Sequence, residues 1–207
     1  MKFRIDVADD VLTFDEAAHE YRLNNIVLPS VTQIIQSAGL VDFSKVPADV
    51  LQLAQERGTA VHTACELYDR DRLDYTSIDP VVWPYLEAWI KFKQQTRFII
   101  LSSETILYAR YRYAGRLDRI GMMEDTPTII DIKTSNIISQ ATGVQTAAYL
   151  HAYCEMGLSR IAQKKYKRFA IHLYDNGKYE IEPYDNPQDW PVFLAALQIY
   201  HYHRRAV

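Results

Sequence analysis

The chain has 207 residues, of which 48% are hydrophobic and 24% are charged, and this composition excludes a disordered or fibrous protein. Its formal net charge of −3 excludes a strongly basic protein, so contacts with phosphates have to come from a local patch. Such a patch is available at Lys164, Lys165, Lys167 and Arg168. No stretch approaches the roughly 18 apolar residues that cross a membrane, and we expect no membrane association.

The cysteines and the N-terminus indicate the cellular setting. Cys65 and Cys154 are too few for a disulfide framework or a four-thiolate metal site. The first ten residues contain no apolar signal core. We therefore expect a reduced protein in the cytoplasm of a host or infected cell.

The first half of the chain predicts short strands followed by helices. Residues 10–28 alternate in polarity around the turn signal Asn24-Asn25. Ser30 and Gln33 fit a capping box that opens a short helix, which ends at Gly39. Residues 48–70 and 80–96 predict two longer helices, the second with Pro84 in its first turn. The inward stripe expected for the first of these helices is Val50, Leu53, Ala54, Val61, Ala64, Cys65 and Tyr68.

The second half predicts the centre of a sheet. Four strands are expected at residues 99–101, 105–113, 115–123 and 128–134, with residues 124–127 as the last turn. A helix at 140–156 follows, then a hairpin of residues 169–174 and 178–184 around Asn176-Gly177, and a final helix at 189–203. No repeat or linker interrupts the chain. We predict one α/β domain over residues 1–207, with a central mixed β-sheet flanked by helices.

An acid and a base lie two residues apart on the last of the four strands. Side chains alternate along a strand, so Asp131 and Lys133 share one face while Ile130 and Ile132 pack on the other. Charged groups on an apolar strand are rarely buried unless they are paired or bind a metal. A structural ion pair explains part of this pattern, but neighbours on one strand rarely align well enough to pair fully.

Asp118 lies on the preceding strand. Counting from a turn centred near Asp125 and Thr126 places Asp118 opposite Lys133, with Asp131 as its diagonal neighbour. Cross-strand neighbours are about 5 Å apart and diagonal ones about 7–8 Å, so a divalent cation fits between the two carboxylates. Hard oxygen ligands favour magnesium or manganese.

Two helical pairs add polar groups. His62 and Glu66 are four residues apart and share a helical face, with Gly58 one turn earlier. The missing side chain at Gly58 would let the helix press against the sheet or a substrate strand. Gln145 and Tyr149 are also four apart, and they offer hydrogen bonds and a stacking face.

Five motifs in order resemble the PD-(D/E)XK nuclease superfamily, in its RecB-like, phage-type exonuclease branch. They span residues 57–149: Arg57 through His62 with Glu66, Glu104, Gly115 through Asp118, Asp131 through Thr134, and Gln145 through Tyr149. Leu28 through Thr32 resembles a stretch ahead of the core in phage-type members. Leu117 replaces the family's nominal proline, and two cysteines cannot hold the iron–sulfur cluster of some relatives.

The resemblance implies a restriction-endonuclease-like core and a role for each motif. Asp118, Asp131 and the Ile132 carbonyl would hold Mg²⁺ or Mn²⁺, with His62 as a further ligand. Lys133 would orient the attacking water and help to deprotonate it. The supporting roles fall to Glu66 or Glu104 for a second ion or an ordered water, to Gln145 and Tyr149 for gripping the strand, and to Arg116 and Arg119 for phosphate contacts.

Each of these residues alone also has a structural interpretation, such as an ion pair for Asp131 with Lys133 or a strand-edge charge for Glu104. Their joint order favours a metal-dependent exonuclease acting on DNA ends in recombination, repair or phage genome processing, with a recombination partner protein. A structure-specific endonuclease on the same fold and an inactive DNA-binding or assembly module are the alternatives. Polarity, strandedness, RNA as a substrate and the oligomeric state stay open.

Overall fold

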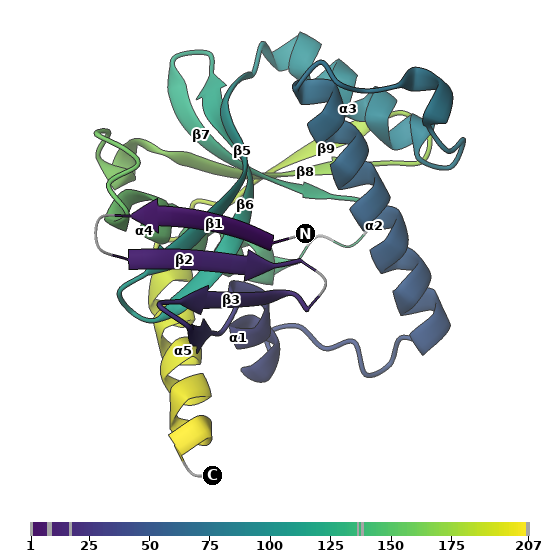
Figure 1. Cartoon of the computed structure of the whole chain (residues 1–207). Coiled ribbons are helices and arrows are strands. Elements are labelled where there is room, and N and C mark those ends of the chain that lie inside the picture. Colours follow the sequence, from purple (N-terminus) through teal and green to yellow (C-terminus); the bar gives the residue numbers. More distant parts are fainter. Residues whose placement is uncertain (1, 8–9, 17, 136, 138, 206–207) are drawn as a thin grey trace.

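The computed structural model describes residues 2–7, 10–16, 18–135, 137 and 139–205. Its centre is a five-stranded sheet in the order β5-β6-β7-β8-β9 (Figure 1). The strands are β5 (Ile99–Ala109), β6 (Tyr113–Met123), β7 (Thr126–Lys133), β8 (Lys167–Leu173) and β9 (Tyr179–Pro183). Only the β7–β8 pair is parallel among these neighbours, so the sheet is mixed, as the sequence predicts.

Helices cover both faces of this sheet. One apolar cluster joins it to α1 (Val31–Ser37), α4 (Gln140–Glu155) and α5 (Asp189–Arg205). A second cluster joins it to α2 (Ala48–Asp69) and α3 (Trp83–Thr96). Short 3-10 turns occupy Tyr75–Ser77 and Gln163–Lys165. None of the helices in the described part of the chain is long and apolar enough to cross a membrane.

The alternation of β7 is confirmed. Ile130 and Ile132 belong to the cluster shared with α2 and α3, whereas Ile129 belongs to the cluster shared with α4. Asp131 and Lys133 therefore point to the α4 side. The Ser30–Gln33 capping box is also present, with Gly39 beyond the helix end at φ +69°.

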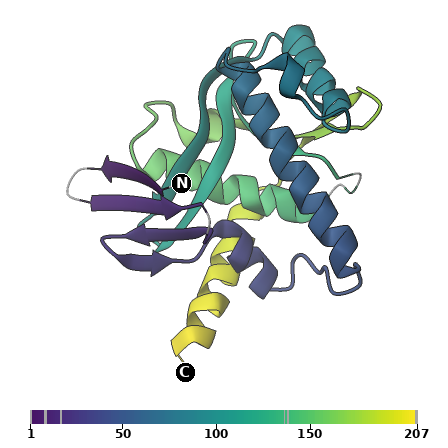
Figure 2. The same ribbon diagram turned by 45° about the vertical axis from the view of Figure 1, so that its right-hand side comes forward.

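A small antiparallel sheet precedes these elements. It consists of β1 (Lys2–Val7), β2 (Asp10–Asp15), β3 (Glu20–Leu23) and β4 (Ile26–Leu28), of which β1 was not expected from the sequence. Its apolar face packs on the large sheet through Leu12, Phe14, Tyr21 and Leu28, against Ile106 and Ala114. In Figure 2 strands β5 and β6 run between this small sheet and α2.

The structure corrects three expectations about elements. Val50 and Leu53 are 51% and 66% exposed, because the first turns of α2 extend beyond the sheet (Figure 1). The segment 105–113 is not one strand, since the chain turns at residues 110–112 between β5 and β6. The last turn uses only Glu124 and Asp125, and Pro127 lies inside β7, opposite Met122.

Candidate active site

The register of the β6–β7 hairpin differs by two residues from the prediction. Arg119 pairs with Ile130, so Asp118 is in line with Asp131 and not with Lys133. The reason is the short turn, in which Glu124 adopts a left-handed φ of 53° that closes the hairpin with two residues. The two carboxylates are therefore direct neighbours across the strands.

Asp118 lies where the ladder between the two strands stops. Its Oδ2 accepts a hydrogen bond of 2.7 Å from the backbone N–H of Ile132, in place of a main-chain carbonyl. The residue is 8% exposed. Burial raises the pKa of Asp118 above its ordinary value, and the negative charge of Asp131 adds to the rise although His62 opposes it. A carboxylate held this way is stabilised by an added cation.

Asp131 and Lys133 form a closely paired acid and base. Lys133 Nζ lies 2.6 Å from Asp131 Oδ2, which corrects the expectation that strand neighbours rarely align. The flexible lysine stem bends back along the strand, and Nζ also donates to Gln145 Oε1 at 3.1 Å. Burial acts to lower the pKa of Lys133, but Asp131 outweighs it, so this pKa is raised and the amine is protonated at neutral pH.

His62 connects α2 to the two strands. Its Nε2 lies 3.0 Å from the Ile132 carbonyl oxygen, and its Nδ1 lies 3.6 Å from Asp118 Oδ1. A carbonyl only accepts, so Nε2 donates to it, and Nδ1 faces Asp118. A neutral ring in this orientation offers the lone pair of Nδ1 to a metal ion beside Asp118. The Ile132 carbonyl, an expected metal ligand, accepts this hydrogen bond.

Glu104 completes a three-residue cluster with His62 and Asp118. One donor atom from each lies within 4.8 Å of the others. Glu104 faces Asp118 across the strands, since its neighbours Ser103 and Thr105 pair with Arg119 and Leu117. Its φ of 49° is unusual for a residue other than glycine, and such backbone strain is found at functional sites. Two carboxylates and an imidazole fit a divalent cation.

Glu104 was the least expected member, and Asp131 is not part of this cluster of donor atoms. Burial raises the pKa of Glu104, and Asp118 adds to the rise against the cations around it. The cluster thus joins two carboxyls whose charged forms are poorly solvated. This is the electrostatic condition that a bound divalent ion relieves.

Arg119 is the clearest correction to the predicted site. It is 0% exposed and cannot touch a phosphate. It donates to Asp69 Oδ2 and to Glu104 Oε1, both at 2.7 Å. Asp69 also accepts hydrogen bonds from Trp89 Nε1 at 2.9 Å and from Lys93 Nζ at 2.7 Å. Arg119 therefore holds Glu104 in place from the end of α2, and this network was missed because it depends on contacts between distant segments.

Tyr149 also departs from its expected role. It is 5% exposed, so its ring has no free face for a base. The ring packs over Gly115, where an added Cβ would lie 2.5 Å from Tyr149 Cε1. Its hydroxyl accepts a hydrogen bond of 3.0 Å from Gln145, which reaches Lys133 in turn. Tyr149 and Gln145 thus position the lysine.

The remaining predicted residues lie around the cluster. Arg116 is partly exposed and pairs with Glu104 at 3.0 Å and with Glu16 at 3.6 Å. Glu66 pairs with Arg70 at 2.6 Å. At Gly58 an added Cβ would meet only Thr134 Oγ1 at 3.6 Å, so packing on the sheet does not require this glycine.

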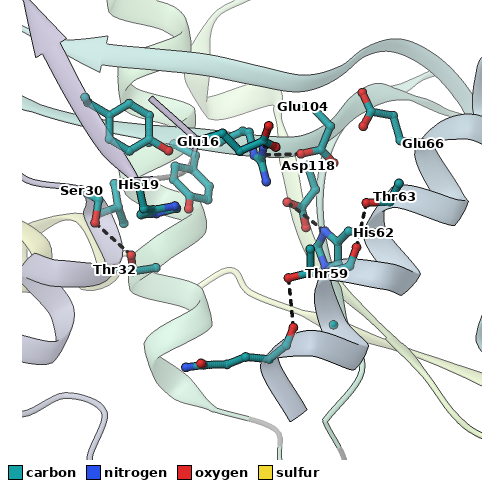
Figure 3. Close-up of a pocket in the computed structure, with 17 residues that line it drawn as sticks. Glu16, His19, Ser30, Thr32, Thr59, His62, Thr63, Glu66, Glu104 and Asp118 are labelled. Atoms are coloured by element: carbon teal, nitrogen blue, oxygen red, sulfur yellow. Dashed lines mark hydrogen bonds and ion pairs between the residues drawn. The ribbon is translucent and has the colours of Figure 1, made fainter. Parts of the chain in front are cut away.

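Two cavities of about 340 Å³ each meet at His62 and Asp118. The first contains the cluster with Glu104 and extends to the small sheet (Figure 3). The second contains Asp131, Lys133 and Gln145. The basic segment 164–168 lines neither of these cavities, and its Arg168 pairs with Asp189 at 2.9 Å. The predicted site residues are thus divided between two adjoining cavities.

Comparison with known protein families gives a match. The model of a family described as the PD-(D/E)XK nuclease superfamily matches residues 77–198, which is more than half of the chain. The matched segment contains Glu104, Asp118, Asp131 and Lys133, whereas His62 and the small sheet precede it. No curated protein matches the chain.

Proposed function

Because this chain belongs to the PD-(D/E)XK nuclease superfamily, we propose that it is a magnesium- or manganese-dependent exonuclease acting at DNA ends. Nucleases of this superfamily depend on divalent metals and act on DNA. The single observation that carries the proposal is the convergence of His62, Glu104 and Asp118 beside the Asp131–Lys133 pair. The motif order resembles phage-type exonucleases, which supports cytoplasmic work in recombination, repair or phage genome processing.

The metal would be held by Glu104, Asp118 and His62, and Asp131 lies next to Asp118 across the strands. A divalent ion at such a site lowers the pKa of bound water and offsets charge on the phosphate. The side chains supply the rest. His62 is held in one tautomer by the Ile132 carbonyl, which keeps the Nδ1 lone pair towards Asp118. The buried walls keep the carboxylates from bulk water.

Lys133 acts as a hydrogen-bond donor in this proposal. Its raised pKa means that Nζ is protonated at neutral pH in the metal-free protein. Asp131 and Gln145 orient the amine, which can donate hydrogen bonds to the attacking water and to a phosphate oxygen. This hydrogen-bonding role is proposed in place of the expected help with deprotonation. The carboxylates are the proton acceptors available beside it.

Digestion of end-labelled DNA tests the proposal. Linear single- and double-stranded substrates are compared with closed circular DNA, with Mg²⁺, with Mn²⁺ and with a chelator. Release of nucleotides from linear DNA only supports an exonuclease, and cleavage of circles supports the endonuclease alternative. Asp131→Asn and Lys133→Met should reduce cleavage at least a hundred-fold. Equal inertness of wild type and variants on all substrates would refute a nuclease.

A further inference from the structure

The first cavity has a second wall, which is formed by the N-terminal segment. The cavity extends from the cluster at His62 to this wall, which lies in and after the small sheet and is lined by Glu16, His19, Ser30 and Thr32. Figure 3 shows His19 and Thr32 on the opposite side of the cavity from His62 and Thr59. These N-terminal residues precede the segment that the family model matches.

His19 presents an aromatic ring in this wall. Phe14 and Tyr21 stack on each other with centroids 4.4 Å apart, and the His19 centroid lies 5.5 Å and 5.8 Å from theirs. A ring nearly equidistant from a stacked pair lies beside the edges of both. The interplanar angles of 87° and 83° confirm this perpendicular arrangement. The pair therefore covers at most one face of the imidazole, and the side chain is exposed at the cavity.

His19 is a neutral aromatic ring with a cation, Arg116, nearby. Partial burial against its neighbours lowers the pKa of His19, and the Arg116 cation lowers it further, so the imidazole is neutral at neutral pH. Arg116 lies with Cζ 5.7 Å from the centre of the Phe14 ring and reaches Glu104. A cation and a neutral ring side by side are the combination on which single-stranded nucleic acids stack.

We propose that His19 stacks on an unpaired nucleobase of the strand that enters the first cavity. The small sheet would then hold the base, while α2 and the large sheet hold the phosphate to be cut. A base inside a duplex has both faces covered, so the site selects a frayed or single-stranded end. At about 340 Å³ the cavity is at the small end of ligand sites, and it suits one nucleotide better than a duplex. This inference rests on the proposed function.

The test measures stacking without cleavage. Single-stranded oligonucleotides carrying 2-aminopurine at one end or the other are titrated with protein in chelator, and fluorescence reports both binding and stacking. Wild type and His19→Phe should quench the fluorescence on binding. His19→Ala and His19→Gly should lose the quenching and bind about five-fold to a hundred-fold more weakly. The glycine variant tolerates the φ of 47° at this position, so loss in both variants reports the ring and not the backbone.

Two controls separate the outcomes. His203→Ala removes an exposed histidine of α5, outside the lining of both cavities, and should behave as wild type. An oligonucleotide with an abasic end should bind equally to wild type and to His19→Ala. If wild type binds DNA while His19→Ala quenches and binds equally well, the stacking inference is wrong and the nuclease proposal stands. If wild type binds no DNA, both are wrong.

Discussion

Replacing Arg119 by methionine should weaken metal binding in a protein that still folds. The variant removes a fully buried cation that contacts both Asp69 and Glu104 at 2.7 Å. Leaving a buried charge without its partner costs about 3–5 kcal/mol of stability. Lys93 and Trp89 still satisfy Asp69. Glu104 keeps Arg116 at 3.0 Å as its one remaining cationic partner among the described residues, so the loss falls mainly on Glu104 and should lie below this range. We therefore expect a folded but destabilised protein.

The effect on the metal follows from the charge of Glu104. Arg119 lowers the pKa of this carboxyl against burial, so the variant raises it further above the ordinary value. Metal binding requires the deprotonated carboxylate, and loss of a supporting partner typically weakens affinity about 10–100-fold. The loss should be larger at pH 6 than at pH 8. Calorimetric titration with Mn²⁺ in the absence of DNA measures it.

Lys93→Met is the matched control for this experiment. Lys93 pairs with Asp69 at 2.7 Å, in the same network, but no contact joins it to Glu104 among those of the described residues. It should lower the melting temperature and leave Mn²⁺ affinity unchanged. Arg119→Lys keeps the charge but cannot span both acids, and it serves if the methionine variant does not fold. Wild-type Mn²⁺ affinity in both Arg119 variants at every pH would refute the positioning role.

Three further outcomes are expected. Gly115→Ala should lower the free energy of unfolding by about 1–3 kcal/mol, because the added Cβ would lie 2.5 Å from the Tyr149 ring. Gly58→Ala should raise it by up to about 1 kcal/mol through helix propensity. Thermal or chemical unfolding measures both, and equal effects would contradict the packing argument. Lys133→Met should abolish cleavage and keep Mn²⁺ binding, whereas Asp118→Asn should lose both; calorimetry beside the digestion assay separates them. Burial raises the pKa of Asp118, so the folded metal-free protein binds more protons than the unfolded chain. The folded protein therefore loses stability as the pH rises from about 3.9, the ordinary aspartate pKa, to the higher pKa of the folded state. Mn²⁺ should therefore raise the melting temperature more at pH 8 than at pH 5, and an equal increase would contradict this.

Local signals in the sequence were sufficient for much of the fold. The Asn176-Gly177 hairpin, the Ser30 capping box and the alternation around Asp131 each depend on a few neighbouring residues, and each is present. The mixed sheet flanked by helices follows from their order. Patterns of this kind are written in consecutive residues, so they can be read without knowing the tertiary structure.

The errors arise where distant segments meet. The position of Asp118 depended on the length of one turn, and a change of two residues moved its partner from Lys133 to Asp131. Arg119 sits among charged residues in the sequence, and only the arrival of Asp69 from α2 makes it a buried anchor. At the start of α2 the apolar stripe was expected to face the sheet. The helix extends beyond the sheet there, so Val50 and Leu53 are exposed.

The point at which β6 and β7 stop pairing provides an NMR probe of the site. The backbone N–H of Ile132 donates to a carboxylate that is also a candidate ligand, at 2.7 Å. Protonation of Asp118 or its coordination to Mg²⁺ changes the electron density at that oxygen, and the amide resonance of Ile132 would move with it. One peak in a nitrogen-labelled sample could thus follow cation occupancy in solution, with neither nucleic acid nor turnover present.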